Sequence, residues 1–291
     1  MHGQQPGSIV VGVDGSPNGT DALEWAAGQA SVRGLPMHLI HAFSPDLPMV
    51  GFGAGTDAET IKEAGRQLLA SCTARVHSRD RSIQVSTALT SGFPSASIIR
   101  SGRDAEVIVV GAHGHGPANF APLGGVAYQV VTHAPCPVAV IRHRDADVPY
   151  GRVVVGVDGS APSLRALVRG FRQAAQRGAE LLVVHAWQAQ GADDPTLTSG
   201  SDWPAYEAVH EAQVRRTIAD AQSTHPEVKV IQEVARGLPA KTLVDRSEGA
   251  DVLLVGDRGL GGFRGLQIGS VAMGSVARAS CPTIVCRAPH H

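Results

Sequence analysis

Short apolar runs alternate along the chain with segments of helical period. The runs Ile9–Val13, Val107–Val110 and Val138–Ile141 are rich in β-branched residues, which is typical of parallel strands buried on both faces. Between such runs, apolar residues recur at i, i+3, i+4 and i+7, the period of a helix with one buried face. The positions that keep this spacing are Leu23, Ala26, Ala27 and Ala30 and, later, Leu164, Leu167, Val168 and Phe171. The alternation predicts parallel sheets with helices packed against them.

Residues with strong positional preferences mark the ends of the predicted helices. Ser16 and Pro17 supply an N-cap and a first-turn proline, and Gly34 and Gly178 supply C-terminal stops. In the first half we predict five strands near residues 8–13, 37–43, 83–89, 106–111 and 136–142. The fold class is then α/β, with a doubly wound, five-stranded parallel sheet.

The same pattern occurs twice, about half a chain length apart. Ile9–Ser16 returns as Val153–Ser160 at an offset of 144 residues. Gly92-Phe93-Pro94 returns as Gly237-Leu238-Pro239 at an offset of 145. Such a period indicates two duplicated domains, because solenoid repeats run about 20–50 residues. We expect one domain over residues 1–145 and a second over 150–291, joined by the polar stretch 142–151.

The composition excludes several classes of protein. Of the 291 residues, 43% are hydrophobic and 18% are charged, so the chain is not of the disordered type. The net charge of −1 gives no general attraction to nucleic acid or to anionic membranes. No apolar run approaches the roughly 18 residues of a membrane span, and the N-terminus shows no secretory signal. We therefore expect a cytoplasmic protein.

Cysteine and histidine patterns do not indicate a metal site. No Cys-x-x-Cys pair occurs, and no cysteine and histidine stand at zinc-ligand spacing. His113 and His115 lie on a glycine-rich segment without a nearby third ligand, which favours solvated or phosphate-facing imidazoles. We expect reduced, buried thiols at the four cysteines, Cys72, Cys136, Cys281 and Cys286.

Two segments of each half belong where an open parallel sheet binds ligands, beyond the carboxyl ends of its strands. One is the Gly-Val-Asp-Gly-Ser exit of the first strand, and the other is a glycine-rich loop after the fourth. In the second half this loop runs from Gly256 to a helix beginning near Gly269-Ser270. Glycines let backbone amides approach an anion, and a helix N-terminus favours phosphate. The alternatives are a purely structural loop, and for Asp158 a turn-forming role in its Asp-Gly-Ser sequence.

The joint pattern is more specific than its parts. Gly256-x2-Gly259-x9-Gly269-Ser270 has the spacing of the ATP-binding motif of the universal stress protein family, and the late Cys-Pro pairs of both halves also resemble that family. The likeness covers both halves almost end to end, so the chain resembles a tandem universal stress protein. The resemblance implies two sheets ordered 3-2-1-4-5, of the adenine nucleotide α-hydrolase-like type. It also implies ATP, with or without Mg²⁺, in the crevice between strands one and four.

The resemblance further implies which residues contact the nucleotide. Asp158 would lie beside the adenine and ribose, with Gly156 under the nucleotide and the backbone near Ala186 against the base. The full second set is Gly156, Asp158, Ala186, Gly256, Asp257, Arg258, Gly259, Leu260, Gly261, Gly262, Gly269, Ser270 and Val271. The matching first set is Gly12, Asp14, Ala42, Gly111, Ala112, His113, Gly114, His115, Gly116, Gly124, Gly125 and Val126.

The two predicted sites are unequal. Gly111-x2-Gly114-x9-Gly124 keeps the motif spacing, but Gly125 stands where the family has Ser or Thr. His113 likewise stands where the second half has Arg258. Loss of a hydrogen bond to a charged phosphate costs on the order of 1.5–3 kcal/mol. We therefore expect the first site to bind ATP more weakly.

ATP binding does not imply ATP turnover. The chain has no Gly-x4-Gly-Lys-Ser/Thr loop and no marked general base for an attacking water. We therefore favour a nucleotide-dependent regulator or switch in stress response or dormancy, with little or no turnover and no catalytic residue. Two alternatives stay open: a slow ATPase or phosphotransferase, and a nucleotide-free interaction scaffold.

The family likeness also bears on assembly. It implies an intrachain pseudo-dimer of the two domains through their last strands, 138–142 and 283–287. We expect a homodimer in addition, with ATP and protein partners of unknown identity but no nucleic acid and no membrane.

Overall fold

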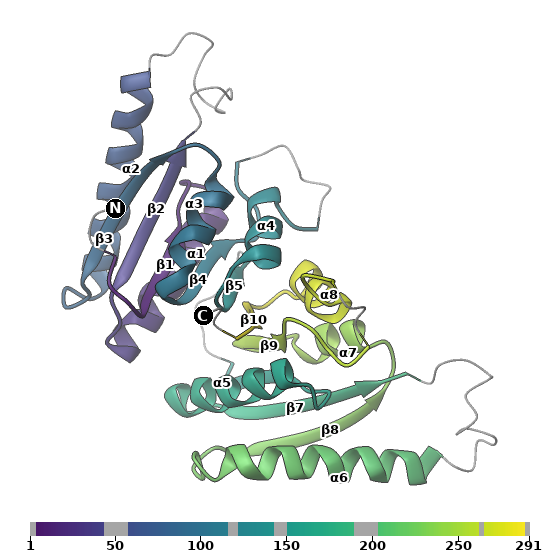
Figure 1. The fold of residues 1–291 in the computed structure, drawn as a ribbon. Helices are drawn as coiled ribbons and strands as arrows, with labels where there is room; N and C mark the ends of the chain where they lie inside the picture. Colours follow the sequence, from purple (N-terminus) through teal and green to yellow (C-terminus); the bar gives the residue numbers. More distant parts are fainter. Residues whose placement is uncertain are drawn as a thin grey trace. The chain divides into compact units, whose positions relative to one another are not determined.

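The chain divides into two compact units between Asp145 and Ala146, and the second unit covers Ala146–Arg287. The computed structural model describes residues 4–43, 58–115, 122–142, 150–188, 203–261 and 265–288, and for residues 203–206 the backbone alone. Each unit alternates strands and helices, as the hydrophobic pattern predicts (Figure 1).

The first unit has five strands and four α-helices among its described residues. In chain order they are β1 (Ser8–Gly12), α1 (Pro17–Arg33), β2 (Met37–Phe43), α2 (Ala58–Arg79), β3 (Val85–Ser91), α3 (Pro94–Ser101), a 3-10 turn (Gly102–Asp104), β4 (Ala105–Gly111), α4 (Gly125–His133) and β5 (Val138–Ile141). The third strand begins two residues later than predicted. Residues 80–83 form a turn instead, in which the Ser82 amide donates to the Asp80 carboxylate at 2.9 Å.

The second unit repeats this order. Its described elements are β6 (Arg152–Gly156), α5 (Ala161–Arg177), β7 (Glu180–Trp187), α6 (Trp203–Gln222), β8 (Val230–Arg236), α7 (Pro239–Arg246), β9 (Val252–Gly256), α8 (Ser270–Arg278) and β10 (Thr283–Cys286). No 3-10 turn stands before β9 in the described part of this unit, whereas one precedes β4.

Both sheets are parallel and have the predicted order. The first unit runs β3-β2-β1-β4-β5, and the second runs β8-β7-β6-β9-β10. In each unit the first strand lies between the second and the fourth, so the chain winds outward in both directions from it. The strand order reverses at this point, which is where open α/β sheets bind ligands.

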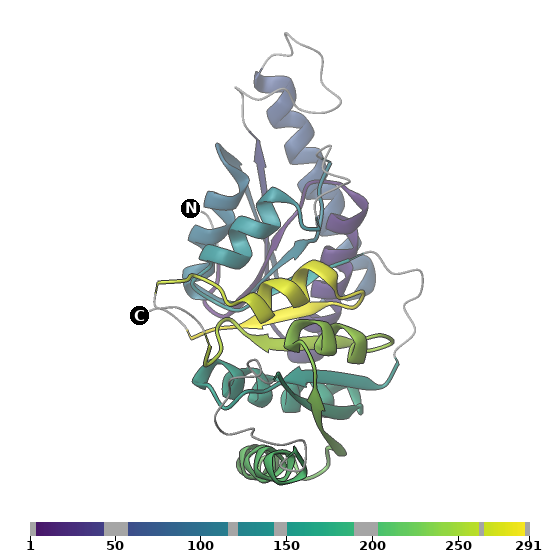
Figure 2. The same ribbon diagram turned by 90° about the vertical axis from the view of Figure 1, so that its right-hand side faces the viewer.

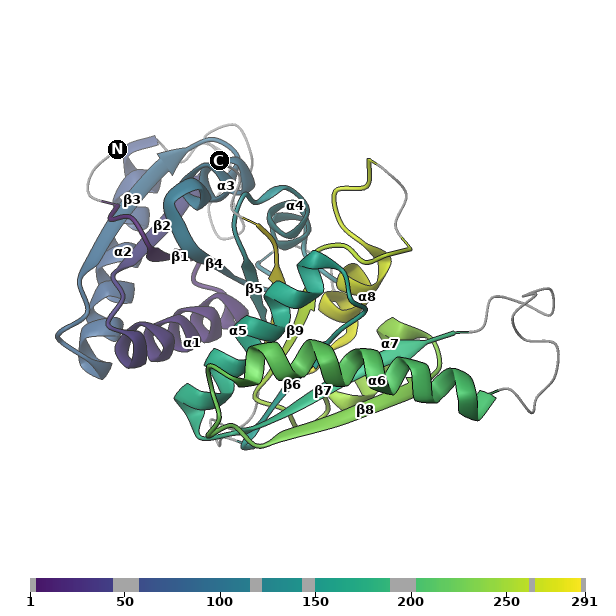
Figure 3. The same ribbon diagram turned by 60° about the horizontal axis from the view of Figure 1, so that its bottom comes forward.

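Helices cover both faces of each sheet. In the first unit α1 and α2 contact each other and the sheet, and α3 and α4 form a second pair (Figure 2). In the second unit α5 and α6 lie side by side on one face, whereas α7 and α8 contact each other (Figure 3). The central strands are therefore almost fully buried, which explains why their sequences are apolar at nearly every position.

The predicted helix ends are confirmed. The Ser16 hydroxyl accepts a hydrogen bond from the Gly19 amide at the start of α1, and Gly34 ends that helix in the left-handed conformation with φ 62°. Gly178 ends α5 in the same way, with φ 60°.

The predicted core face of α5 is wrong in part. Leu167 and Phe171 are buried, as expected, but Leu164 and Val168 are 40% and 45% exposed. The helical period assigned all four residues to one stripe. However, the sheet and α6 cover only part of that stripe in the described residues, because the apolar face is wider than the surface packed against it.

Three further properties concern the described part of the chain. None of its helices is long and apolar enough to span a bilayer. No three His, Cys, Asp or Glu side chains in it come together as a metal site would require. All four cysteines are buried thiols.

Candidate functional site

A cavity of about 350 Å³ lies at the carboxyl ends of β1 and β4 in the first unit. Residues from β1, β2, α1, α3, α4 and the loop after β4 line it. All eleven predicted first-site residues that the structure describes are among them: Gly12, Asp14, Ala42, Gly111, Ala112, His113, Gly114, His115, Gly124, Gly125 and Val126. Gly116 lies outside the described residues.

The two sides of this cavity differ in chemistry. On the side of β2 and α3 the lining is mostly apolar, with Ile40, Ala42, Pro94 and Ile98 beside His41. On the side of β4 and α4 the lining combines glycines, His113, His115 and the start of a helix with the apolar Val110, Ala112 and Ala127. Since β1 lies between β2 and β4 in the sheet, these two linings face the cavity from opposite sides of β1.

Close backbone contacts account for two glycines of the motif. A Cβ on Gly111 would lie 2.7 Å from the backbone carbonyl carbon of Asn18 in α1. A Cβ on Gly124 would lie 3.1 Å from the carbonyl oxygen of Ala112, which already accepts a hydrogen bond from the Gly124 amide at 2.8 Å. The glycine spacing therefore has a packing function and also keeps the cavity open.

The helix α4 begins at the cavity without a side-chain cap. Gly124 is its N-cap residue, and among the described residues α4 has no side-chain cap hydrogen bond. The first amides of a helix have no intrahelical acceptor and carry partial positive charge. The position of a Cβ on Gly125 is open space with respect to the described residues outside its own turn of helix. This helix start can therefore accept an anion of the size of a phosphate.

Asp14 is held at the exit of β1 by the start of α1. Its carboxylate accepts hydrogen bonds from the amide and the hydroxyl of Ser16, at 2.9 Å and 2.6 Å. The ring Nδ1 of His115 faces the other carboxylate oxygen at 3.8 Å. The aspartate therefore has the turn-forming role considered from the sequence, and its second oxygen still faces the glycine-rich loop.

The second unit repeats this arrangement around Asp158. The Asp158 carboxylate accepts hydrogen bonds from the Ser160 amide at 2.9 Å and from the Leu260 amide at 3.0 Å. Burial raises the pKa of this carboxyl group, but the hydrogen bonds from Ser160, Leu260 and Ser163 outweigh burial and bring the pKa below its ordinary value. Asp158 is thus an anion that ties the glycine-rich loop to the exit of β6.

The other predicted residues of the second site lie around this link. Gly156 ends β6, Ala186 is in the neighbouring β7, and Gly256 ends β9. Gly269 is the N-cap of α8 without a side-chain cap, and its amide donates to the Asp257 carbonyl at 2.7 Å. Ser270 and Val271 form the first turn of α8, Arg258, Gly259, Leu260 and Gly261 follow Asp257 in the loop, and Gly262 lies outside the described residues.

The two units differ in how the aspartate meets the loop. In the second unit the Asp158 carboxylate bonds the Leu260 amide, whereas in the first the His115 side chain faces Asp14. The second unit also carries a buried carboxylate, Asp257, beside Arg258 at 3.5 Å, where the first has Ala112. Both differences occur where the two loops carry different side chains between the motif glycines, so the glycine spacing alone does not predict them.

The histidines at the ends of the second strands have a structural partner. The Nδ1 atoms of His41 and His185 lie 2.8 Å from the carbonyl oxygens of Val13 and Val157. Both rings are buried. Each histidine therefore links the second strand of its unit to the exit of the first.

Sequence reasoning missed the part of the lining that comes from α3. Pro94 and Ile98 line the cavity, as do Ile40, Ser16 and Gly19. The repeated Gly-x-Pro sequence after the third strand was a usable signal, because it is kept in both halves. The sequence alone did not indicate that Gly-x-Pro belongs to the site, because α3 comes to lie beside β1 only in the folded unit.

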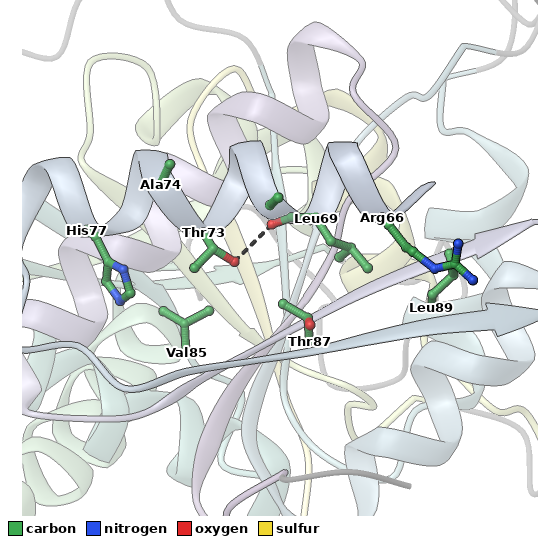
Figure 4. A pocket seen from close by; sticks show the side chains of 9 residues that line it. Arg66, Leu69, Thr73, Ala74, His77, Val85, Thr87 and Leu89 are labelled. Atoms are coloured by element: carbon green, nitrogen blue, oxygen red, sulfur yellow. Dashed lines mark hydrogen bonds between the residues drawn. The ribbon is translucent and has the colours of Figure 1, made fainter. Parts of the chain in front are cut away.

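A larger open hollow of about 610 Å³ lies between α2 and β3 (Figure 4). Two of its polar side chains are already engaged: the Thr73 hydroxyl donates to the Leu69 carbonyl at 2.9 Å, and Arg66 bonds Glu59 and Glu63. None of the predicted site residues lines it. The smaller cavity at the strand ends is therefore the candidate site.

Comparisons with known proteins identify the family and support the fold. The universal stress protein family matches the chain at residues 7–142 and 149–287. The universal stress proteins Rv2623 and Rv2005c of Mycobacterium tuberculosis (strain H37Rv) are 34% and 33% identical to the chain, over 96% of each sequence. A crystal structure of a universal stress protein from Archaeoglobus fulgidus has a TM-score of 0.69 at 19% identity. That match covers 97% of this chain and 96% of the other, and it supports the fold.

Proposed function

Because the chain belongs to the universal stress protein family, we propose that it binds ATP in each unit and acts as a nucleotide-dependent regulator. The setting we propose is stress response or dormancy, in the cytoplasm and as a homodimer, with little or no ATP turnover. The observation that carries the proposal is the cavity at the exits of β1 and β4, which is mostly apolar on one side and rich in glycines, with a helix start, on the other.

This cavity suits the two ends of a nucleotide. A purine base gains from apolar contacts such as Ile40, Ala42 and Ile98. Phosphates gain from the uncapped amides at the start of α4 and from small residues that let the backbone approach. Asp14 lies at the exit of the strand between these two linings, where a ribose hydroxyl could donate to its carboxylate.

The second unit has the stronger donors for phosphate in this proposal. Ser270 places a hydroxyl in the first turn of α8, and Arg258 carries a permanent positive charge. Gly125 and His113 hold the matching positions in the first unit. We therefore assign the tighter ATP site to the second unit.

Regulation would operate through linkage. A ligand that binds one conformation of the chain better than another shifts the population toward that conformation. Low turnover fits the glycine-rich loops, because neither contains the lysine of a phosphate-clamping Gly-x4-Gly-Lys loop. ATP bound with or without Mg²⁺ would serve as a reporter of cellular energy state.

The test is to release and count the nucleotide of freshly purified protein and to measure ATP binding by calorimetry. We expect up to two ATP per chain, with the second site lost in Ser270→Asp and the first lost in Gly125→Asp. Both substitutions place an acidic side chain in the first turn of a helix, where it favours the helix but repels phosphate. Both variants are therefore expected to remain folded.

Each of the other results contradicts a named part of the proposal. Recovery of ADP, with turnover that disappears in Asp158→Ala, would favour a slow ATPase or phosphotransferase. Absence of nucleotide, of binding heat and of thermal stabilisation by ATP would favour an interaction scaffold. A particle mass of one chain by light scattering would contradict the homodimer.

A further inference from the structure

Both units expose a large apolar side chain at the same place, directly after the third strand. Phe93 is 72% exposed and Leu238 is 58% exposed. They match at the repeat offset of 145 residues, in Gly92-Phe93-Pro94 and Gly237-Leu238-Pro239.

The position of each residue is one that normally carries a polar side chain. Phe93 is the N-cap of α3, Leu238 is the N-cap of α7, and neither makes a side-chain capping hydrogen bond. Ser, Thr, Asp and Asn are strongly preferred at such positions because they satisfy a first-turn amide. Helix α3 of the first unit and helix α7 of the second thus both lack a side-chain N-cap and expose an apolar side chain in its place. Departures of this kind from local rules are expected at functional sites.

The turn that carries Phe93 is fixed beside the cavity. The Gly92 amide donates to the carbonyl oxygen of Phe43 at 2.8 Å, one residue after the cavity residue Ala42. On the other side of Phe93, Pro94 and Ile98 both line the cavity. In the second unit the Gly237 amide makes the same hydrogen bond to Trp187, also at 2.8 Å. Phe93 therefore stands directly beside the apolar lining that α3 contributes.

We propose that Phe93 and Leu238 contact the base of the bound nucleotide and set the base selectivity of the two sites. The proposal rests on the proposed function. Phe93 offers an aromatic face on which a purine stacks better than a pyrimidine, whereas Leu238 offers apolar contact without stacking. The first unit thus holds the phosphates more weakly but the base more strongly. The second unit holds the phosphates more strongly but the base more weakly.

The variant chosen for the test takes advantage of the absent side-chain N-cap of α3. Phe93→Ser removes the ring and supplies the polar N-cap that α3 lacks, so this variant is expected to be at least as stable as the parent. A loss of affinity then cannot be attributed to unfolding. The parent carries Ser270→Asp, so that the first site alone reports.

Calorimetric titrations with ATP, CTP and inorganic tripolyphosphate measure the effect. We expect Phe93→Ser to weaken ATP binding about tenfold, within the range for loss of one base–aromatic stack. Tripolyphosphate affinity should not change, and the preference for ATP over CTP should shrink. Phe93→Leu should lower that preference toward the value of the second site, measured in a chain with Gly125→Asp.

Val32→Ser is the matched control, because Val32 is 64% exposed on α1 and does not line the cavity. It should leave ATP affinity unchanged. If the parent binds ATP and Phe93→Ser and Phe93→Leu bind it equally well, the base-contact proposal is wrong and the proposed function stands. If wild-type protein binds no ATP, the proposed function itself fails.

Discussion

At the scale of single residues, the replacement of a serine by Gly125 is the difference with the most direct energetic consequence. The space beside Gly125 is open among the described residues, so a serine Cβ can be added at the start of α4 without meeting any of them. We expect Gly125→Ser to strengthen ATP binding at the first site by about tenfold, since a hydrogen bond to a charged group contributes about 1.5–3 kcal/mol. Calorimetry of the Ser270→Asp chain measures this gain.

The reverse change serves as its counterpart. Ser270→Gly in a chain whose first site is silenced by Gly125→Asp should weaken ATP binding by a similar factor. Gain in one unit without loss in the other would show that the hydroxyl is not a phosphate donor in the second site.

A second prediction at this scale concerns acid stability. His210 of α6 stacks on His185, with ring centroids 4.7 Å apart, and lies parallel to Trp187. Burial and the neighbouring His185 lower the pKa of His210 below 6.5, and burial lowers the pKa of His38 in the same direction. In the pH range below about 6.5 the unfolded chain therefore binds more protons than the folded chain, and the free energy of unfolding decreases as the pH falls.

His210→Phe keeps a stacked ring but removes its titration. Urea unfolding between pH 7.5 and pH 5 should then show a flatter decrease in stability than in wild type. His133→Phe is the matched control, since His133 lies on the exposed side of α4. Equal slopes in wild type and His210→Phe would show that the His210 pKa is not the cause.

At the scale of elements, the left-handed glycines that end helices α1 and α5 make a local contribution to the stability of each unit. Gly34 has φ 62°, a conformation that costs an L-residue about 1 kcal/mol. Gly34→Ala should lower the free energy of unfolding by about that amount, as measured by denaturant titration. Gly34→Asn should cost less, because asparagine tolerates this conformation better.

The elements also show what the sequence could and could not predict. Buried parallel strands have continuous apolar runs, so the strands and the strand-exit loops were predictable from the sequence pattern, whereas the strand order came from the family resemblance. The exposed Leu164 and Val168 were not, because helical period shows that a face is apolar but not how much surface its neighbours cover. The contribution of Pro94 and Ile98 to the cavity depends on packing between segments about 80 residues apart in the chain. The link between Leu260 and Asp158 likewise depends on loop conformation.

At the scale of the whole molecule, two sites of unequal affinity on one chain respond to different ATP concentrations. We expect hydrogen exchange to slow around β9 and α8 at lower ATP concentration than around β4 and α4. At 100 times its Kd a ligand adds about 2.7 kcal/mol to the free energy of unfolding of the structure that binds it. Mass spectrometry of the exchanged peptides measures both transitions in one titration.

Ser270→Asp separates the two transitions. It should abolish the protection around α8 and leave the transition around α4 at its original ATP concentration. Protection of both regions at one common concentration in wild type would contradict unequal sites.

The hydrogen bond from the Leu260 amide to Asp158 also has a consequence for the rates of exchange. This carboxylate oxygen has a second lone pair, so a nucleotide hydroxyl can donate to it while the Leu260 amide keeps the glycine-rich loop tied to Asp158. In the first unit the matching oxygen faces the His115 ring at 3.8 Å, a longer contact that ties the loop less firmly. Under the proposed function, the first unit follows rapid changes in the ATP pool, whereas the second has the longer residence time and retains a record of earlier ATP levels.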